Sequence, residues 1–94
     1  MKIFLVRYNY FDVSNAKLAK TEDGIEKKIL EIFREEYPYA DSVSVKIIYK
    51  GESSYSKKVR VFVVRFCISY KNDPKLYQEN RDIYVEEFDT EELE

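Results

Sequence analysis

The side chains that could do chemistry in this chain are serines, lysines, carboxylates and tyrosines, because the sequence contains no histidine. A Ser-His-Asp or Cys-His arrangement is therefore excluded, and a zinc site would have only one thiolate and carboxylates to draw on. Ser14 with Lys17, and Ser54 with Lys57, have the S-x-x-K spacing of a serine nucleophile and its lysine base. That chemistry also needs a helix start inside a large cleft, and two matches in so short a chain show how readily the spacing arises by chance.

Binding loops for phosphate or calcium are not expected either. The two glycines, Gly24 and Gly51, are too few for a phosphate-binding loop. The acidic residues from Glu86 to Glu94 lack the spacing and the central glycine of an EF-hand. We therefore predict no catalytic residue, no cofactor and no metal, and a protein that is not an enzyme.

Composition favours a small binding domain that is soluble and cytoplasmic. The 94 residues are 45% hydrophobic and 36% charged, and nine tyrosines and six phenylalanines supply large rings for a compact core. Arg7 interrupts the apolar start of the chain before it reaches the length of a signal sequence. Cys67 has no partner for an internal disulfide, and its apolar neighbours predict a buried thiol in a reducing compartment.

Periodicity predicts four strands and one main helix. Residues 2–11, 43–50 and 58–70 are rich in β-branched and aromatic residues, and 83–88 suggests a last strand. Between the first two strands, apolar residues recur at helical spacing from Ile25 to Tyr37. Asp23 with Glu26 resembles a capping box and Pro38 ends the helix. Residues 12–21 show no strong period, and a short helical turn is expected over 74–80.

This order favours a ferredoxin-like βαββαβ fold with a reduced second helix, in which the first and third strands are the central pair. The alternative is an α+β sheet of β-α-β-β-β order with one helix on one face. Either way we expect a single α+β domain over 1–88, followed by an acidic tail over 89–94 whose charge favours disorder.

The face of the predicted sheet that the helix leaves open carries more aliphatic side chains than a soluble protein normally exposes. The helix is expected to cover the longest apolar set: Phe4, Val6, Tyr8, Val45, Ile47, Phe62, Val64, Phe66 and Ile68. The opposite, open face is then expected to hold the aliphatic residues Ile3, Leu5, Val59, Val61 and Val63, beside the polar residues Arg7, Asn9, Lys46, Lys50 and Arg65. A partner protein, a second copy of the chain or the acidic tail is expected to cover this set, which makes a homodimer the favoured state.

Charge is unevenly distributed around a net value of −2. Residues 41–71 carry seven basic and two acidic side chains, whereas residues 72–94 carry nine acidic and two basic ones. Tyr39 and Tyr55 lie in predicted connections, where no role in the core is expected for them, and they are candidate interface anchors. The predicted partner-binding set is Tyr39, Tyr55, Lys57, Lys58, Arg65, Arg7, Lys46 and Lys50.

Two hypotheses for function remain open. The first is a non-catalytic protein-binding module that inhibits or adapts a larger protein or nucleoprotein assembly, a role that small acidic proteins of phages and mobile elements often have. The second is a domain that binds RNA or single-stranded nucleic acid through the basic region 46–65.

Overall fold

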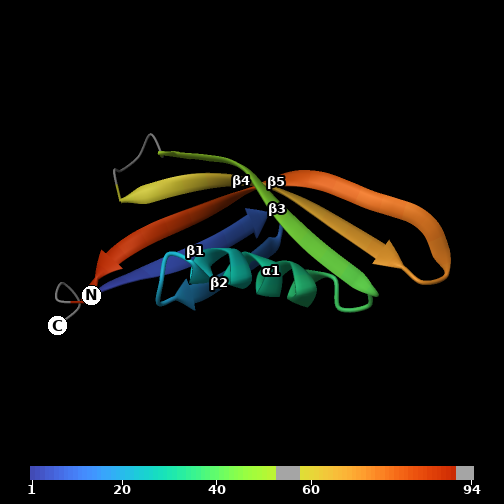
Figure 1. Cartoon of the computed structure of the whole chain (residues 1–94), viewed down its shortest axis with the longest axis horizontal. Coiled ribbons are helices and arrows are strands. Elements are labelled where there is room, and N and C mark those ends of the chain that lie inside the picture. Colours follow the sequence, from blue (N-terminus) through green and yellow to red (C-terminus); the bar gives the residue numbers. More distant parts are fainter. Residues whose placement is uncertain (53–57, 91–94) are drawn as a thin grey trace.

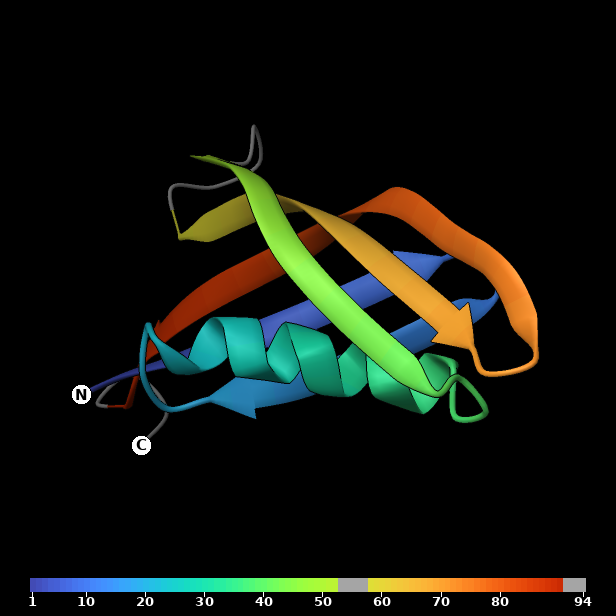
Figure 2. The same cartoon turned by 45° about the vertical axis from the view of Figure 1, so that its right-hand side comes forward.

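The computed structural model describes residues 1–52 and 58–90. These residues form a small single-domain α+β fold, in which an antiparallel five-stranded sheet carries one helix and is not closed into a barrel (Figure 1). The elements are β1 (Lys2–Tyr10), β2 (Val13–Ala19), α1 (Gly24–Glu36), β3 (Ser42–Glu52), β4 (Val59–Tyr70) and β5 (Asp73–Asp89). Figure 2 shows α1 lying along one face of a strongly twisted sheet.

The predicted helix is confirmed, and its core face is the predicted one. Ile25, Ile29, Ile32 and Phe33 are buried, and the helix ends at Glu36, before Pro38. The expected capping box is wrong, because the Asp23 side chain makes no capping hydrogen bond. Thr21 takes that role instead: its Oγ1 accepts a hydrogen bond from the Gly24 amide at 3.0 Å.

The core forms between α1 and the face of the sheet that the aromatic pattern indicated. Phe4, Val6 and Tyr8 of β1 are buried there with alternate residues of β4 from Phe62 to Ile68, and Val45 and Ile47 of β3 pack against them. Ile83 and Val85 of β5 complete this layer. The face assignment made from sequence is confirmed for all nine residues.

The strand β2 was missed because its inward-facing side chains are partly polar. Asn15 and Lys17 point to the helix side, where Asn15 donates to Glu36 and Lys17 forms an ion pair with Glu35. These contacts with the flank of α1 replace the apolar alternation that marks most half-buried strands. The helical turn expected over 74–80 is also wrong, since these residues lie within β5.

The order of the strands is β2-β1-β5-β4-β3, so the expected central pair of first and third strands is wrong. β5 lies between β1 and β4 and is antiparallel to both. The physical reason is the short connection from Tyr70 to Asp73, which permits only a hairpin, whereas the ferredoxin-like order needs a helical crossover. The specific features of the ferredoxin-like scheme are therefore not confirmed.

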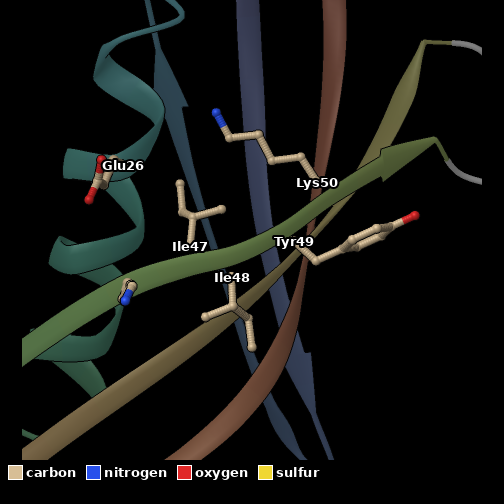
Figure 3. Close-up of a pocket in the computed structure, with 6 residues that line it drawn as sticks. Glu26, Ile47, Ile48, Tyr49 and Lys50 are labelled. Carbon is tan, nitrogen blue, oxygen red and sulfur yellow. The ribbon is translucent and has the colours of Figure 1, made fainter.

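A β-bulge in β3 reverses the faces of its last residues. Ile47 pairs with Val64 and Tyr49 with Val63, which leaves Ile48 as the extra residue. Ile47 and Lys50 consequently point toward α1, while Ile48 and Tyr49 point away (Figure 3). The prediction that Lys50 lies on the open face is wrong: its Nζ lies 5.5 Å from the centroid of the buried Phe62 ring.

Candidate interaction surfaces

The open face is the side of the sheet that α1 does not cover. The predicted contact residues Ile3, Leu5, Val59, Val61 and Val63 are each half-buried there, on β1 and β4, which flank β5. The structure adds four apolar neighbours that the sequence did not assign: Leu18, Tyr49, Tyr84 and Phe88. Leu18 is 57% exposed and Tyr49 is 61% exposed.

One ion pair lies within this apolar set. Arg7 Nη2 is 3.1 Å from Glu86 Oε1, and the two residues occupy neighbouring positions on β1 and β5. Arg7 lies beside Tyr84, and Glu86 lies between Leu5 and Val59. The apolar set of the open face therefore surrounds one paired charge of each sign, Arg7 and Glu86.

The basic residues predicted to bind a partner are spread over both sides of the sheet. Lys46 and Arg65 face each other across β3 and β4 on the open face, and the Arg65 Nε donates to Asn80 Oδ1 at 3.2 Å. Arg7 is held by Glu86, and Lys50 lies on the helix side near Glu22 and Glu26. The structure does not bring these residues together as one basic patch.

The remaining predicted residues lie at the ends of the molecule or outside the described residues. Tyr39 is 90% exposed in the connection between α1 and β3, as expected for a candidate anchor. Lys58 is exposed just before β4, and its carbonyl accepts a hydrogen bond from the Glu87 amide. Tyr55 and Lys57 fall outside the described residues. The prediction of a buried Cys67 thiol is wrong, because Cys67 is half-buried on the open face. Its Sγ lies 3.4 Å from Gln78 Oε1.

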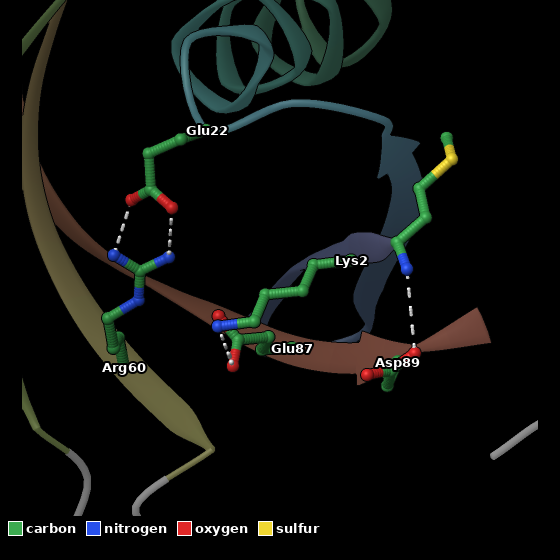
Figure 4. A network of polar contacts seen from close by, with 6 residues as sticks. Lys2, Glu22, Arg60, Glu87 and Asp89 are labelled. Atoms are coloured by element: carbon green, nitrogen blue, oxygen red, sulfur yellow. Dashed lines mark hydrogen bonds and ion pairs between the residues drawn. The ribbon is translucent and has the colours of Figure 1, made fainter. Parts of the chain in front are cut away.

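One end of the molecule is ionic. Arg60 makes a bidentate contact with Glu22 at 2.5 and 3.1 Å, Lys2 lies 3.6 Å from Glu87, and the terminal amine lies near Asp89 (Figure 4). The Arg60 guanidinium lowers the pKa of the Glu22 carboxyl against an opposing effect of burial. Arg60 belongs to the basic region 46–65, but its guanidinium is already paired with Glu22 and lies over the Phe4 and Phe62 rings.

The opposite end is aromatic. Here the buried Phe33 stacks on Phe66 with ring centroids 4.6 Å apart, and Tyr37 lies 5.4 Å from Phe66. Tyr8 lies 5.0 Å from Phe33 and nearly parallel to Tyr10. Burial raises the pKa of both the Tyr8 and Tyr37 hydroxyls, so these rings remain neutral at physiological pH.

Arg81 of β5 is inserted into this aromatic end. Its side chain is 14% exposed, and its guanidinium carbon lies 3.8 Å from the Tyr10 centroid and 5.4 Å from the Phe66 centroid. One terminal nitrogen pairs with Glu79, and the other donates to the Asn80 carbonyl at 2.8 Å. The buried Nε has no hydrogen-bond partner among the described residues.

A cleft of about 320 Å³ opens beside these rings, between the turn joining β1 to β2 and the end of α1. We call it the aromatic cleft; its lining residues are Tyr8, Tyr10, Phe11, Asp12, Val13, Glu36 and Tyr37. Phe11 stands at its edge with 90% of its surface exposed and a positive φ of 54°. Bulky residues rarely adopt this left-handed conformation.

Sequence reasoning missed both Arg81 and the aromatic cleft. In the sequence Arg81 is one of two basic residues in an acidic stretch, and it falls between the helical turn predicted over 74–80 and the last strand predicted over 83–88. The signal that was present is Tyr10-Phe11-Asp12, a bulky pair before an aspartate at the junction of a strand and a polar segment. The turn chemistry usual for a two-residue hairpin, Asn-Gly or Asp-Gly, is absent there.

Comparison with known proteins gives no match: no family model matches the chain, and no curated protein or solved structure matches it significantly. The class is therefore defined by the fold alone, a small α+β domain with a one-sided antiparallel sheet. No helix in the described part of the chain is long and apolar enough to cross a membrane. Among residues 1–52 and 58–90, no three acidic or cysteine side chains lie close enough together to hold a metal ion.

Proposed function

We propose that this protein is a non-catalytic protein-binding module that forms a homodimer through the open face of its sheet. The observation that carries the proposal is the set of nine apolar side chains on that face, which no element of the described chain overlies. Apolar side chains left in water over all five strands favour association, since each one removed from solvent contributes free energy.

A second copy suits this face better than a strongly charged partner does. A two-fold interface joins a surface to itself, so the surface must be self-complementary. The open face has one positive and one negative charge at adjacent positions, Arg7 and Glu86, within the apolar set. A two-fold pairing allows Arg7 of each copy to meet Glu86 of the other, while the aliphatic residues pack together.

In this proposal the dimer holds a larger protein or nucleoprotein assembly, as an inhibitor or an adaptor. Protein is favoured over nucleic acid as the partner because, among the described residues of the basic region, only Lys46 and Arg65 lie together on the open face. A phosphate backbone needs several such contacts for useful affinity. The dimer leaves the ends of the molecule and the outer surface of α1 for this partner.

The test is the mass in solution of the full chain and two lysine variants, measured by light scattering over a range of concentrations. Val61 lies opposite Tyr84 and Gly51 on the open face, so Val61→Lys places a charge inside the interface. Leu30→Lys makes the same type of change on α1, away from the sheet's open face. We expect twice the 11.3 kDa chain mass for the unmodified protein and for L30K, and a monomer for V61K.

Two results would overturn the proposal: an unmodified protein that stays monomeric at every concentration, or a V61K variant that dimerises as well as L30K. A circular dichroism spectrum of V61K shows whether the fold is kept. If V61K unfolds, the smaller change Val61→Thr is measured in its place, with weaker dimerisation expected.

A further inference from the structure

We propose that the aromatic cleft binds a basic side chain, arginine or lysine, presented by a partner protein. This inference rests on the proposed role in protein binding but not on the dimer, because the cleft lies on the helix side of the sheet. Its walls come from three segments: the end of β1 with its turn, the start of β2 and the end of α1.

The exposed rings of the cleft, Tyr10 and Phe11, are suited to a cation, whereas the Tyr8 ring is buried. The face of an aromatic ring carries partial negative charge and attracts an ammonium or guanidinium group within about 6 Å. Tyr8 and Tyr10 lie 6.5 Å apart with an angle of 7° between their planes. Tyr10 already contacts one guanidinium at 3.8 Å, that of Arg81, which is not among the residues lining the cleft. The same end of the molecule thus binds a basic group from its own chain.

The carboxylates of the cleft supply the complementary charge. Asp12 forms no hydrogen bond or ion pair with any described residue, and Glu36 accepts one hydrogen bond from the uncharged amide of Asn15 at 3.3 Å. The neighbouring Glu35, by contrast, is neutralised by Lys17 at 2.6 Å. Two carboxylates without a cation therefore line the cleft, which favours a basic ligand and disfavours a phosphate or a carboxylate.

Phe11 indicates that the ligand is part of a protein rather than a free small molecule. Its ring lies in a T-shaped arrangement with Tyr10, the two centroids 4.5 Å apart, but is otherwise in solvent, at the edge of the cleft. A side chain in this position offers apolar contact to residues beside the basic one, and exposed rings of this type often anchor protein interfaces. The charge of the cleft then selects the residue that enters it.

The experiment measures amide chemical shifts of the full chain, labelled with nitrogen-15, during titration with three blocked amino acids. The probes are N-acetyl-arginine amide, N-acetyl-lysine amide and N-acetyl-citrulline amide, the last of which has the shape of arginine without its charge. We expect the first two to shift the amides of Tyr10, Phe11 and Glu36 until saturation. Citrulline amide is expected to bind at least about tenfold more weakly, because cation attraction and ion pairing are both lost.

A matched pair of double variants separates the cleft from general acidity. Asp12→Asn with Glu36→Gln removes the two carboxylates of the cleft and is expected to weaken binding of the arginine probe about fivefold to tenfold. Asp23→Asn with Glu26→Gln makes the same chemical change at the other end of α1 and is expected to leave the affinity unchanged.

The inference is overturned if none of the probes shifts these amides, if citrulline amide binds as well as arginine amide, or if both double variants bind equally. The oligomeric mass of each sample is measured in parallel. Arginine binding by a monomeric protein would contradict the proposed homodimer and support the proposed cleft. A dimer that does not bind arginine would support the homodimer and contradict the cleft.

Discussion

The guanidinium carbon of Arg81 lies 3.8 Å from the centroid of the Tyr10 ring. The backbone ladder between β1 and β5 ends at Arg7 with Tyr84, so this contact joins the two strands beyond their last paired residues. Burial opposes the charge of Arg81, but hydrogen bonds to Glu79 and Tyr8 outweigh it and raise the pKa of the guanidinium. Arg81 therefore remains charged at every pH at which the protein is folded.

Replacement of Arg81 by alanine is expected to lower the free energy of unfolding by about 2 kcal/mol. The change removes the contacts with Tyr10 and Phe66, together with the alkyl stem that packs between strands. Arg81→Met keeps an unbranched stem and removes a buried Nε that has no partner among the described residues. It is therefore expected to lower the free energy of unfolding by less than about 1 kcal/mol. Urea denaturation monitored by circular dichroism measures both.

Lys75→Ala is the control for the Arg81 variants, since Lys75 is exposed on the same strand. It is expected to change the free energy of unfolding by less than about 0.5 kcal/mol. If Arg81→Ala proves as mild as this control, the stacking on Tyr10 does not stabilise the fold.

Phe11→Asn is expected to stabilise the protein by about 0.5 kcal/mol. Asparagine tolerates the positive φ of 54° at this position, where other side chains cost roughly 1–2 kcal/mol. The loss of the exposed edge contact with Tyr10 offsets part of that gain. Phe11→Ala loses the same contact without relieving the backbone, so it is expected to be less stable than Phe11→Asn by about 1 kcal/mol.

Urea titration of the two Phe11 variants measures the strain, and the arginine probe measures the consequence for binding. Greater stability of Phe11→Asn together with weaker binding of the arginine probe would show why phenylalanine stands at a strained turn. Equal stability of the Asn and Ala variants would mean that the backbone carries no strain there.

The helix and the buried face of the sheet could be predicted from sequence because their signals are local and periodic. Ile25 to Phe33 follow the helical repeat, and Phe62 to Ile68 alternate along one long strand. The residues that these periods assign to the core side are all buried. Burial of large apolar side chains dominates the energy there, so pattern and structure agree.

The strand order and the cleft could not be predicted, since they depend on contacts between distant residues. The place of β5 beside β1 is set by pairs such as Val6 with Val85, which no local period reveals. Lys50 lies on the helix side and not on the predicted open face, because one extra residue, Ile48, enters the ladder opposite β4. The aromatic cleft likewise arises only when the end of α1 meets the turn after β1.

Phe33→Ala is expected to lower the free energy of unfolding by about 3–5 kcal/mol. The ring is fully buried, stacks on Phe66 and contacts Tyr8, so its removal leaves a cavity between α1 and the sheet. Phe33→Leu fills most of this space and is expected to cost about 1–2 kcal/mol. Thermal unfolding followed by circular dichroism should rank the proteins as unmodified, then Leu, then Ala; equal melting temperatures for Leu and Ala would show that the cavity collapses freely.

The ion pair between Glu22 and Arg60 is expected to make stability depend on pH in the acidic range. The hydrogen bonds from Arg60 lower the pKa of the folded Glu22 carboxyl below the value of about 4.3 that it has in the unfolded chain. A depressed pKa contributes stability that is present above the unfolded value and is lost as the pH falls through the folded value. The contribution is below about 1 kcal/mol, since the Glu22 side chain is 55% exposed.

The measurement compares the unmodified protein with Glu22→Gln by urea titration at several pH values. We expect a constant difference between pH 7 and about 5.5, which shrinks as the pH falls below about 4. Glu26→Gln is the matched control, because it makes the same substitution at a glutamate that forms no ion pair with any described residue. High salt should reduce the Glu22 effect by screening. A difference that grows on acidification would mean that the contact with Arg60 raises the pKa of the carboxyl, and the ionic end would then not stabilise the fold at neutral pH.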